Sequence, residues 1–386
     1  NTITFDGGNG NAASRILTFA TGASGSGLSH VLRFNNCNFV TFRNMTIRSS
    51  GASEAWTAHF MNGTNNRLIK CIIDMTGNGT TSTSTNFTSV VINGSTTSIG
   101  TTSTIANNHR VDSCTINFGY YGIFSSINNG ALTNFFTNNN FANTYYSGGW
   151  FQNAQTVKFN NNTINTRSTM TTAQPIFLQS VNPSGSNFNE VNGNTLVRTG
   201  QYGIYFVSTQ GGISNQGQCY NNFINGMTST NSTVGIYLNS ASNWNLYHNT
   251  VNHDINSTSG LNYGIQIQNG SNNDVRNNIL STTIPTAFNW TPLFINPSSA
   301  VSALNSNNYW NPSSSNLVNI GGVNYTSSNF KVAYPSGGGS NSINLNPAYV
   351  SASNIHVTSA CNNGENLGVL VDIDGQTRAG VPDMGA

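Results

Sequence analysis

Val157-Lys158-Phe159-Asn160-Asn161-Asn162-Thr163-Ile164 is the stretch that decides the fold, because its pattern returns along the chain. One apolar residue stands three positions before a marked Asn, and another stands two positions after it. The marked Asn recurs at positions 162, 194, 222, 249 and 278, in steps of 32, 28, 27 and 29 residues. Between copies lies a second apolar run, such as Gly203-Ile204-Tyr205-Phe206. A cycle of short strands with no helical period predicts a β-solenoid.

The two apolar columns around the marked Asn lie five residues apart, as Phe159 and Ile164 do. Side chains on a flat strand alternate with period two, so an odd offset cannot point both columns inward unless the backbone bends between them. Asn is the non-glycine residue that best tolerates the left-handed conformation of such a bend. Stacked Asn side chains can also hydrogen-bond from coil to coil. We therefore expect a structural Asn ladder of Asn140, Asn162, Asn194, Asn222, Asn249 and Asn278.

The number of repeats predicts an all-β fold, a single right-handed parallel β-helix of roughly 10–12 coils. The crossovers hold too few residues for a βαβ sheet, which needs a dozen or more and usually a helix. We assign residues 1–300 to the parallel β-helix. Beyond residue 300 the period weakens, with Pro312, Pro335 and the Gly337-Gly338-Gly339 run. Residues 301–386 are expected to form irregular C-terminal coils or a cap that continues the solenoid.

Charged residues are sparse, at 6% of the chain, and the net charge is +2. The strong positive field that drives nucleic-acid binding is therefore not expected. No apolar run approaches the roughly 20 residues that span a bilayer. The chain opens in the middle of its repeat pattern at Asn1-Thr2-Ile3-Thr4-Phe5, which indicates a processed product or part of a longer protein.

The five cysteines are an odd number and contain no C-x-x-C motif, which argues against a zinc site or a disulfide framework. Cys71 and Cys114 occupy the same slot in consecutive repeats. Strands stacked about 4.8 Å apart are within disulfide range. A column of buried free thiols is the alternative reading, and the pattern favours it.

The C-terminal region resembles a known class. Asn346-Pro347-Ala348-Tyr349-Val350, Val371-Asp372-Ile373-Asp374-Gly375-Gln376-Thr377-Arg378 and Pro382-Asp383-Met384-Gly385-Ala386 are similar to the closing signature of right-handed β-helix proteins with a pectate-lyase-like fold. Residues 2–15 resemble the opening of β-helix segments in large secreted bacterial surface proteins. The resemblance implies secretion to the cell surface, often with a further surface-anchor or type IX sorting domain, and a fold that in many members cleaves polysaccharides.

A catalytic site would need titratable groups close together. Glycoside hydrolysis needs two carboxylates within about 5–10 Å, and the resemblance implies a Lys or Arg base beside bound Ca²⁺ for a lyase. The best candidate group lies in the consecutive coils of Cys71 and Cys114: Lys70, Asp74, His109, Arg110 and Asp112. An ordinary surface salt bridge between Lys70 and Asp112 is the simpler reading.

Two further features bear on ligands. Asp372 and Asp374 resemble the first half of a calcium loop, but the later oxygen ligands are missing, so a turn closed by Gly375 is favoured and no cofactor is expected. The residue after the apolar Ile of the second strand should face outward. In three copies it is aromatic (Phe124, Tyr205 and Tyr237), which can stack on sugar rings, contact a protein, or simply suit a β surface.

These observations favour an extracellular structural or adhesive module, secreted or at the cell surface, whose partners are further copies of itself, as in a filament, or surface glycans. Sparse titratable groups, low net charge and an N-terminus that begins directly in strand pattern support this interpretation. The alternative is a polysaccharide lyase or glycoside hydrolase that acts on extracellular glycans.

Overall fold

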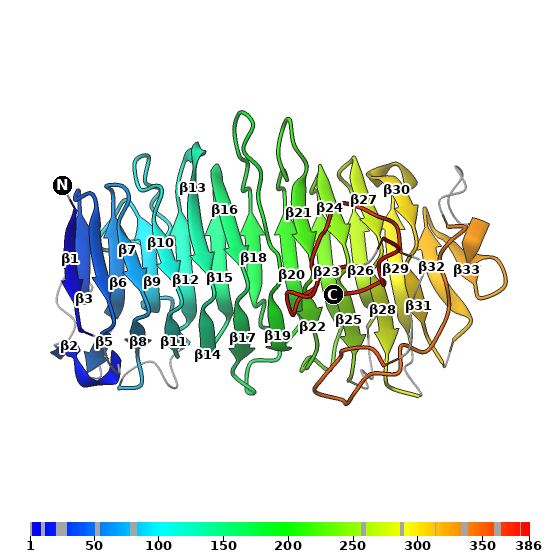
Figure 1. Cartoon of the computed structure of the whole chain (residues 1–386), viewed down its shortest axis with the longest axis horizontal. Helices are drawn as coiled ribbons and strands as arrows, with labels where there is room; N and C mark the ends of the chain where they lie inside the picture. Colours follow the sequence, from blue (N-terminus) through cyan, green and yellow to red (C-terminus); the bar gives the residue numbers. More distant parts are fainter. Residues whose placement is uncertain are drawn as a thin grey trace. The chain divides into compact units, whose positions relative to one another are not determined.

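The computed structural model describes residues 2–8, 12–20, 29–50, 55–77, 83–255, 260–285, 289–312, 314–332, 339–358, 364–378 and 380–386. Almost all regular structure is β-strand (Figure 1). The described helices are single 3₁₀ turns: η1 (Ala12–Ser14), η2 (Ser298–Ala300) and η3 (Phe330–Val332). Contacts divide the chain into two compact units, with residues 1–170 and 175–189 in unit 1 and residues 171–174 and 190–386 in unit 2.

Unit 1 is a parallel β-solenoid with three strands per coil, which form three sheets, A, B and C (Figure 1). Sheet A contains β1 (Ile3–Asp6), β4 (Val40–Arg43), β7 (Arg67–Ile69), β10 (Arg110–Asp112), β13 (Asn129–Thr137) and β16 (Gln155–Asn160). Sheet B contains β2 (Ile16–Ala20), β5 (Thr46–Ser50), β8 (Ile72–Asp74), β11 (Thr115–Asn117), β14 (Asn140–Thr144) and β17 (Thr163–Thr166). Sheet C contains β3 (Ser29–Asn35), β6 (Ala55–Met61), β9 (Phe87–Asn93), β12 (Tyr121–Ser126), β15 (Ser147–Gln152) and β18 (Ile176–Gln179).

Unit 2 repeats this coil. Its sheet A contains β21 (Gly217–Tyr220), β24 (Trp244–Tyr247), β27 (Asn273–Arg276) and β30 (Val301–Asn305). Its sheet B contains β19 (Thr195–Arg198), β22 (Phe223–Ile224), β25 (Thr250–His253), β28 (Ile279–Thr282) and β31 (Asn308–Trp310). Its sheet C contains β20 (Tyr202–Val207), β23 (Val234–Asn239), β26 (Asn262–Gln268), β29 (Trp290–Asn296), β32 (Asn316–Ile320) and β33 (Val323–Thr326). The β32–β33 pair is antiparallel. The right-handed parallel β-solenoid predicted from the repeats is thus confirmed.

The expected amide ladder lies at the corner between sheets A and B. In unit 2 the side-chain oxygen of each Asn accepts from both the backbone N–H and the Nδ2 of the Asn one coil earlier. Asn222 donates in this way to Asn249 Oδ1 at 3.2 and 2.8 Å, and its Nδ2 also donates to the carbonyl of Val191 at 2.8 Å. The same bonds join Asn194 to Asn222, Asn249 to Asn278 and Asn278 to Asn307. Each buried amide therefore satisfies both its donors and its acceptor.

In the ladder of unit 1, the member before Asn162 is Asn139, and the assignment of Asn140 was wrong. Asn139 is buried and donates from its backbone N–H and its Nδ2 to Asn162 Oδ1, at 2.9 and 3.0 Å, whereas Asn140 is exposed. With Asn139 as the marked residue, the flanking apolar positions are Phe136 and Phe141, both fully buried. Core packing of these two rings fixes the register, because a shift of one residue would turn both rings to solvent.

The left-handed residue at the corner is also one position away from the expected one. It precedes the ladder residue instead of coinciding with it, as Asn161 (φ 57°), Asn221 (φ 53°) and Asn277 (φ 60°) show. Other types take this position too, including Lys70 (φ 52°) and His248 (φ 52°). The backbone bend is therefore made by one residue and the ladder hydrogen bonds by the Asn that follows it. The buried Asn contributes its amide hydrogen bonds and not the left-handed conformation.

The end of the chain follows a different course from the coils. Strands β30 and β31 still pair in parallel with β27 and β28, so coils continue past residue 300. The described residues between 339 and 386 form no regular strand and lie against the β22, β25 and β28 side of unit 2. Met384 packs on Ile279, and Tyr349 and Val357 join the same cluster. We call residues 341–386 the return segment.

Candidate functional sites

The candidate catalytic residues do not form one group. His109 is two residues before the core residue Val111, so it shares the inward face of its strand and is fully buried. Its Nδ1 contacts the N–H of Asn66 at 3.3 Å, and its ring lies 4.8 Å from the ring of Phe60. Burial lowers the pKa of His109 to about 3. A neutral imidazole inside the core cannot act on a substrate at the surface.

Asp74 lies on a different sheet from the other acid of the group, in β8 of sheet B. Its carboxylate accepts from Arg48 Nε at 2.8 Å and from the hydroxyl and N–H of Thr76. These bonds lower its pKa despite the opposing effect of burial. Asp74 is thus an ionised group that closes a turn and pairs with Arg48.

Lys70, Arg110 and Asp112 do lie together, on the outward face of sheet A and at its corner. Arg110 and Asp112 flank the core residue Val111, and the backbone N–H of Lys70 donates to the carbonyl of Asp112 at 2.9 Å. The carboxylate of Asp112 accepts from Ser113, Thr137 and Asn138. Both Lys70 and Asp112 are among the described residues, and no ion pair joins them.

Arg67 is the member of this face that the sequence analysis missed. It is the direct cross-strand partner of Arg110, which in turn faces Phe135, and Phe135 faces Lys158. The guanidinium of Arg110 lies 4.9 Å from the centre of the Phe135 ring. The sequence could have placed Arg67 on this face. Arg67 and Arg110 directly precede the core residues Leu68 and Val111, and alternation along a strand turns the residue before an inward one to the outward face.

A second candidate surface is the outward face of sheet C, where the aromatic residues gather. In unit 1, Phe124, Trp150 and Phe177 occupy one cross-strand column, and Tyr121 packs beside Phe124 and Trp150. The ring centres of Trp150 and Phe177 are 4.4 Å apart. Phe124 is only 3% exposed, because the neighbouring rings cover it. Trp150 retains more of its surface.

In unit 2 the same face holds Tyr205 and Tyr237, stacked with ring centres 4.8 Å apart and an interplanar angle of 11°. Tyr237 is 8% exposed, whereas Tyr205 is half-buried. The hydroxyl of Tyr237 donates to Gln268 Oε1 at 2.7 Å. Sequence reasoning placed these residues on the outward face of the sheet, but it could not show that the rings cover one another.

This aromatic face ends in a cavity of about 370 Å³ between β26, β29 and the β32–β33 hairpin. Its lining residues carry no formal charge: Leu261, Tyr263, Asn289, Trp290, Thr291, Phe294, Ser314, Asn316, Asn319 and Asn324. Of the described atoms in this lining, the buried indole N–H of Trp290 and the side-chain oxygen of Asn319 have no hydrogen-bond partner. Unsatisfied buried donors and acceptors are rare in native proteins and call for an explanation at each position. The amides of Asn316, Asn319 and Asn324 in the lining can exchange hydrogen bonds with the hydroxyl groups of a ligand.

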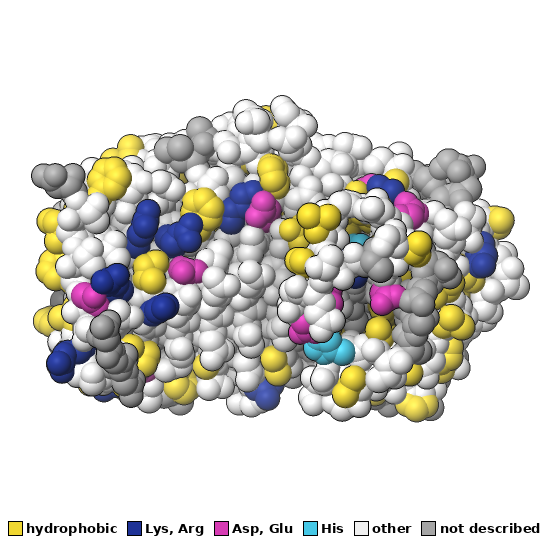
Figure 2. Space-filling view, viewed as in Figure 1, with side chains coloured by type: hydrophobic (Ala, Val, Ile, Leu, Met, Phe, Trp, Pro, Cys, Tyr) yellow, Lys and Arg dark blue, Asp and Glu magenta, His cyan; other side chains and the backbone are white. Residues whose placement is uncertain are grey.

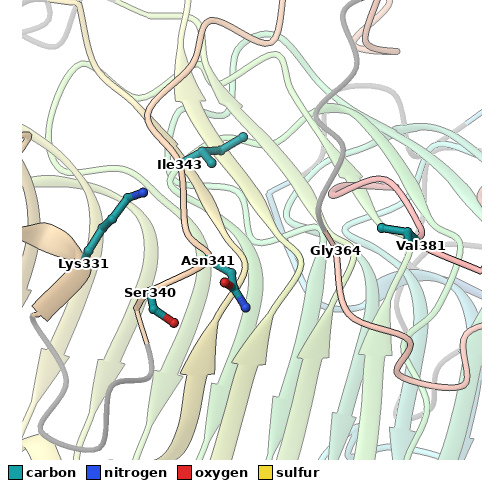
Figure 3. A pocket seen from close by; sticks show the side chains of 6 residues that line it. All are labelled: Lys331, Ser340, Asn341, Ile343, Gly364 and Val381. Atoms are coloured by element: carbon teal, nitrogen blue, oxygen red, sulfur yellow. The ribbon is translucent and has the colours of Figure 1, made fainter.

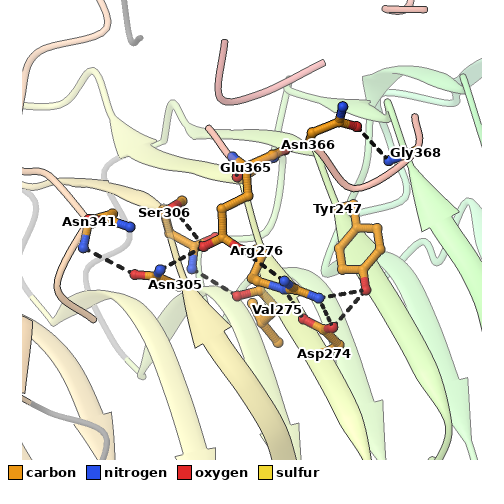
Figure 4. A network of polar contacts seen from close by, with 12 residues as sticks. Tyr247, Asp274, Val275, Arg276, Asn305, Ser306, Asn341, Glu365, Asn366 and Gly368 are labelled. Atoms are coloured by element: carbon orange, nitrogen blue, oxygen red, sulfur yellow. Dashed lines mark hydrogen bonds and ion pairs between the residues drawn. The ribbon is translucent and has the colours of Figure 1, made fainter. Parts of the chain in front are cut away.

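The return segment is held to unit 2 by a polar network (Figure 4). Glu365 accepts from Arg276 at 2.8 Å, from Asn305 at 2.6 Å and from Ser306 at 2.9 Å. Arg276 also pairs with Asp274, whose carboxylate accepts from the hydroxyl of Tyr247 at 2.6 Å. The bound carboxylates raise the pKa of Arg276. This network is structural, because every charge in it is paired within unit 2.

A cavity of about 450 Å³ lies where the return segment meets the last coils, and its lining residues are Lys331, Ser340, Asn341, Ile343, Gly364 and Val381 (Figure 3). Lys331 is the charged member of this lining. The set contains one cation and no aromatic ring, so it offers neither an acid–base pair nor a stacking surface.

Asp372 and Asp374, the candidate calcium residues, have local partners. Asp372 Oδ1 accepts from the N–H groups of Asp374 and Gln376 at 3.0 and 2.8 Å, which closes the turn at Gly375. Asp374 lies 2.8 Å from His356 Nε2. Within the described residues, no three His, Cys, Asp or Glu side chains are grouped as metal ligands.

Cys71 and Cys114 are adjacent in the ladder column and are free thiols, as are Cys37 and Cys219. The N–H of Cys71 lies 3.4 Å from Cys114 Sγ. Burial raises the pKa of Cys114 and of Cys219. The buried thiols of Cys114 and Cys219 are therefore protonated and unreactive. Cys361 lies outside the described residues.

Comparison with known proteins gives this chain no family: no family model matches it, and no curated protein matches it. Over the part of the chain that the structure describes, no helix has the length and apolar character to cross a membrane.

Proposed function

We propose that this chain is an extracellular adhesive module, secreted or held at the cell surface, that binds neutral glycans on the outward face of sheet C. The observation that carries the proposal is the uncharged cavity of unit 2, where the rings of Tyr263 and Phe294 meet the amides of Asn316, Asn319 and Asn324. Aromatic faces pack against the C–H faces of sugar rings, and amides donate to and accept from sugar hydroxyls.

The size and chemistry of the cavity support this ligand class. About 370 Å³ falls within the range of small-molecule sites and would hold a short stretch of a sugar chain. Its lining offers no charge to recognise an acidic sugar. The half-buried rings of Tyr202, Tyr205 and Phe294 continue along the face and would extend contact with a longer chain.

The resemblance to secreted β-helix surface proteins with a pectate-lyase-like fold agrees with this role. Extracellular β-helices are suited to adhesion because stacked coils present a long surface of regularly spaced side chains. A surface-anchor or sorting domain of the kind that the resemblance implies would hold such a surface at the exterior of the cell.

The enzymatic alternative, a polysaccharide lyase or glycoside hydrolase, would use the outward face of sheet A in unit 1. Lys70, Arg110 and Asp112 lie together there, but Asp74 lies on sheet B and His109 in the core. Hydrolysis needs a second carboxylate within about 5–10 Å. A reducing-sugar and unsaturated-product assay of the native chain and the Asp112→Ala variant tests this alternative.

Binding to immobilised neutral polysaccharides tests the adhesive proposal. The variants Phe294→Ala and Asn319→Ala should each weaken binding at least about tenfold, which corresponds to the loss of one well-formed contact of about 1.4 kcal/mol. Asn140→Ala, an exposed amide of unit 1, serves as the matched control and should bind like the native chain. The proposal is wrong if the native chain binds no neutral glycan, or if both cavity variants bind as tightly as the control.

A further inference from the structure

The few charges of this chain are divided unevenly between the two units. Unit 1 contains nine of the 13 Lys and Arg residues and four of the 11 acids, whereas unit 2 contains four Lys and Arg and seven acids. Unit 1 therefore carries a formal charge of +5 and unit 2 a formal charge of −3, although the whole chain is nearly neutral. Such asymmetry between parts of one chain indicates an electrostatic partner for each part.

The positive charge of unit 1 is concentrated on the outward face of sheet A, which we call the basic face: Arg67, Lys70 and Arg110. Lys and Arg side chains gather over β7, β10 and β16 in the space-filling view (Figure 2). Arg67 and Arg110 are direct cross-strand partners, an arrangement in which like charges destabilise a sheet. None of the three forms an ion pair in the described part of the chain. Arg110 lies over the Phe135 ring, which keeps its charge at the surface.

The return segment carries three of the acids of unit 2, Asp372, Asp374 and Asp383, which we call the acidic end; Asp374 and Asp383 are exposed, and Asp372 is half-buried. The backbone carbonyl of Asp383, and not its carboxylate, accepts from Arg378, whose positive charge offsets part of the negative charge of Asp372 and Asp383. Two apolar side chains stand beside these acids, Leu370 at 74% exposure and Val381 at 64%. Exposed apolar residues bordered by charge are typical of a protein contact surface.

We propose that the basic face of unit 1 in one copy binds the acidic end of unit 2 in a second copy. The charges of the two surfaces are complementary, and both belong to the same chain, so they are present at equal concentration wherever the protein is. The two surfaces differ, so the contact is heterologous and head-to-tail, and each bound copy leaves one surface of each kind open. Repetition of this contact builds a chain of copies. This inference is independent of glycan binding on sheet C.

A second copy fits the basic face better than an anionic polymer does. Binding to a polyanion depends on many cations along its path, and its affinity falls steeply with salt in proportion to their number. In the described part of the chain, the basic face provides three cations that form no ion pair, one carboxylate (Asp112) and a partly buried aromatic ring. The apolar Leu370 and Val381 of the acidic end can pack against such a surface, and a polyanion has no equivalent group.

Sedimentation and light scattering of the whole chain at several ionic strengths provide the first test. At about 0.01 M salt the screening length is about 30 Å, and at about 1 M it is about 3 Å. The mean mass should rise to about twice that of one chain or more at low salt and return to that of one chain at high salt. The proposal is wrong if the chain stays monomeric at low salt and high concentration. This conclusion holds even if the chain then binds a sulfated or carboxylated polysaccharide.

Charge reversal provides the sharper test. The variant Arg67→Glu with Arg110→Glu and the variant Asp374→Lys with Asp383→Lys should each remain monomeric at low salt. A mixture of the two should associate again, because the reversed surfaces are complementary to each other. Arg15→Glu with Arg33→Glu is the matched control for the Arg pair, with the same change in net charge at exposed sites away from sheet A, and should associate like the native chain.

The outcomes of this test are distinguishable. Circular dichroism and thermal unfolding of each variant establish that it is folded. Failure of the mixture to associate, with both variants folded, would refute the contact, and so would a control that also loses association. The glycan-binding variant Phe294→Ala should self-associate normally, so that the two proposals can fail separately.

Discussion

Replacement of Asn139 by Ala should destabilise unit 1, whereas the same replacement at its neighbour Asn140 should have almost no effect. The Asn139 side chain makes three hydrogen bonds in the core: Nδ2 donates to the Val111 carbonyl and to Asn162 Oδ1, each at 3.0 Å, and Oδ1 accepts from the N–H of Cys114 at 2.9 Å. Asn140 is exposed and its side chain forms none of these bonds.

The magnitude follows from these bonds. A typical intramolecular hydrogen bond contributes about 0.5–1.5 kcal/mol, and a buried group left without a partner costs about 1–3 kcal/mol. Three lost bonds, with the Cys114 N–H and the Val111 carbonyl left without partners, amount to about 2–5 kcal/mol. An exposed Asn→Ala replacement stays within about 0.5 kcal/mol of zero.

Urea unfolding followed by far-UV circular dichroism measures the difference, and hydrogen exchange at the Cys114 amide locates it. The Asn139→Ala variant should unfold at lower urea, and the Cys114 amide should exchange faster, while amides around Asn249 in unit 2 stay protected. The register described here is refuted if Asn140→Ala is as costly as Asn139→Ala, or if Asn139→Ala costs less than about 0.5 kcal/mol.

Three further predictions concern other parts of the molecule. Gly235→Ala should lower the stability of unit 2 by about 1–3 kcal/mol in thermal unfolding, because the added Cβ would lie 2.3 Å from Val251 Cγ1; an unchanged melting temperature would contradict this packing. Glu365→Ala removes an ion pair of Arg276 and should loosen the return segment, so hydrogen exchange in residues 364–378 should be faster while the ladder amides stay protected. If residues 364–378 are as well protected in the variant as in the native chain, the network does not hold the segment. Burial lowers the pKa of His109 to about 3, so below about pH 6.5 the unfolded chain takes up a proton at this residue while the folded chain does not, and the free energy of unfolding should fall by up to about 1.4 kcal/mol per pH unit as the pH drops towards 3. The His109→Asn variant should show a smaller dependence of the free energy of unfolding on pH. Urea unfolding at pH 7 and pH 5 measures it, and an unchanged pH dependence in the variant would contradict the prediction.

The candidate site was only partly accessible to sequence reasoning. The inward orientation of His109 could have been inferred from its two-residue spacing to Val111, because alternation places both on one face. The cross-strand contact of Arg67 and Arg110 required the register of consecutive coils, which are separated by an insert of uneven length. The mutual burial of the aromatic residues on sheet C depends on ring packing between strands, which no local pattern encodes.

The sequence by itself determined the parallel solenoid and most of its amide ladder, because each coil repeats the same apolar columns at the spacing that one turn of the backbone requires. It could not choose between Asn139 and Asn140 from the identical amides of Asn138-Asn139-Asn140, and the tertiary structure decided this through the burial of Phe136 and Phe141. Only the tertiary structure placed the return segment on unit 2, since residues 341–386 carry no repeat. Their position depends on individual contacts, such as that of Glu365 with Arg276, which link residues 89 apart in the chain.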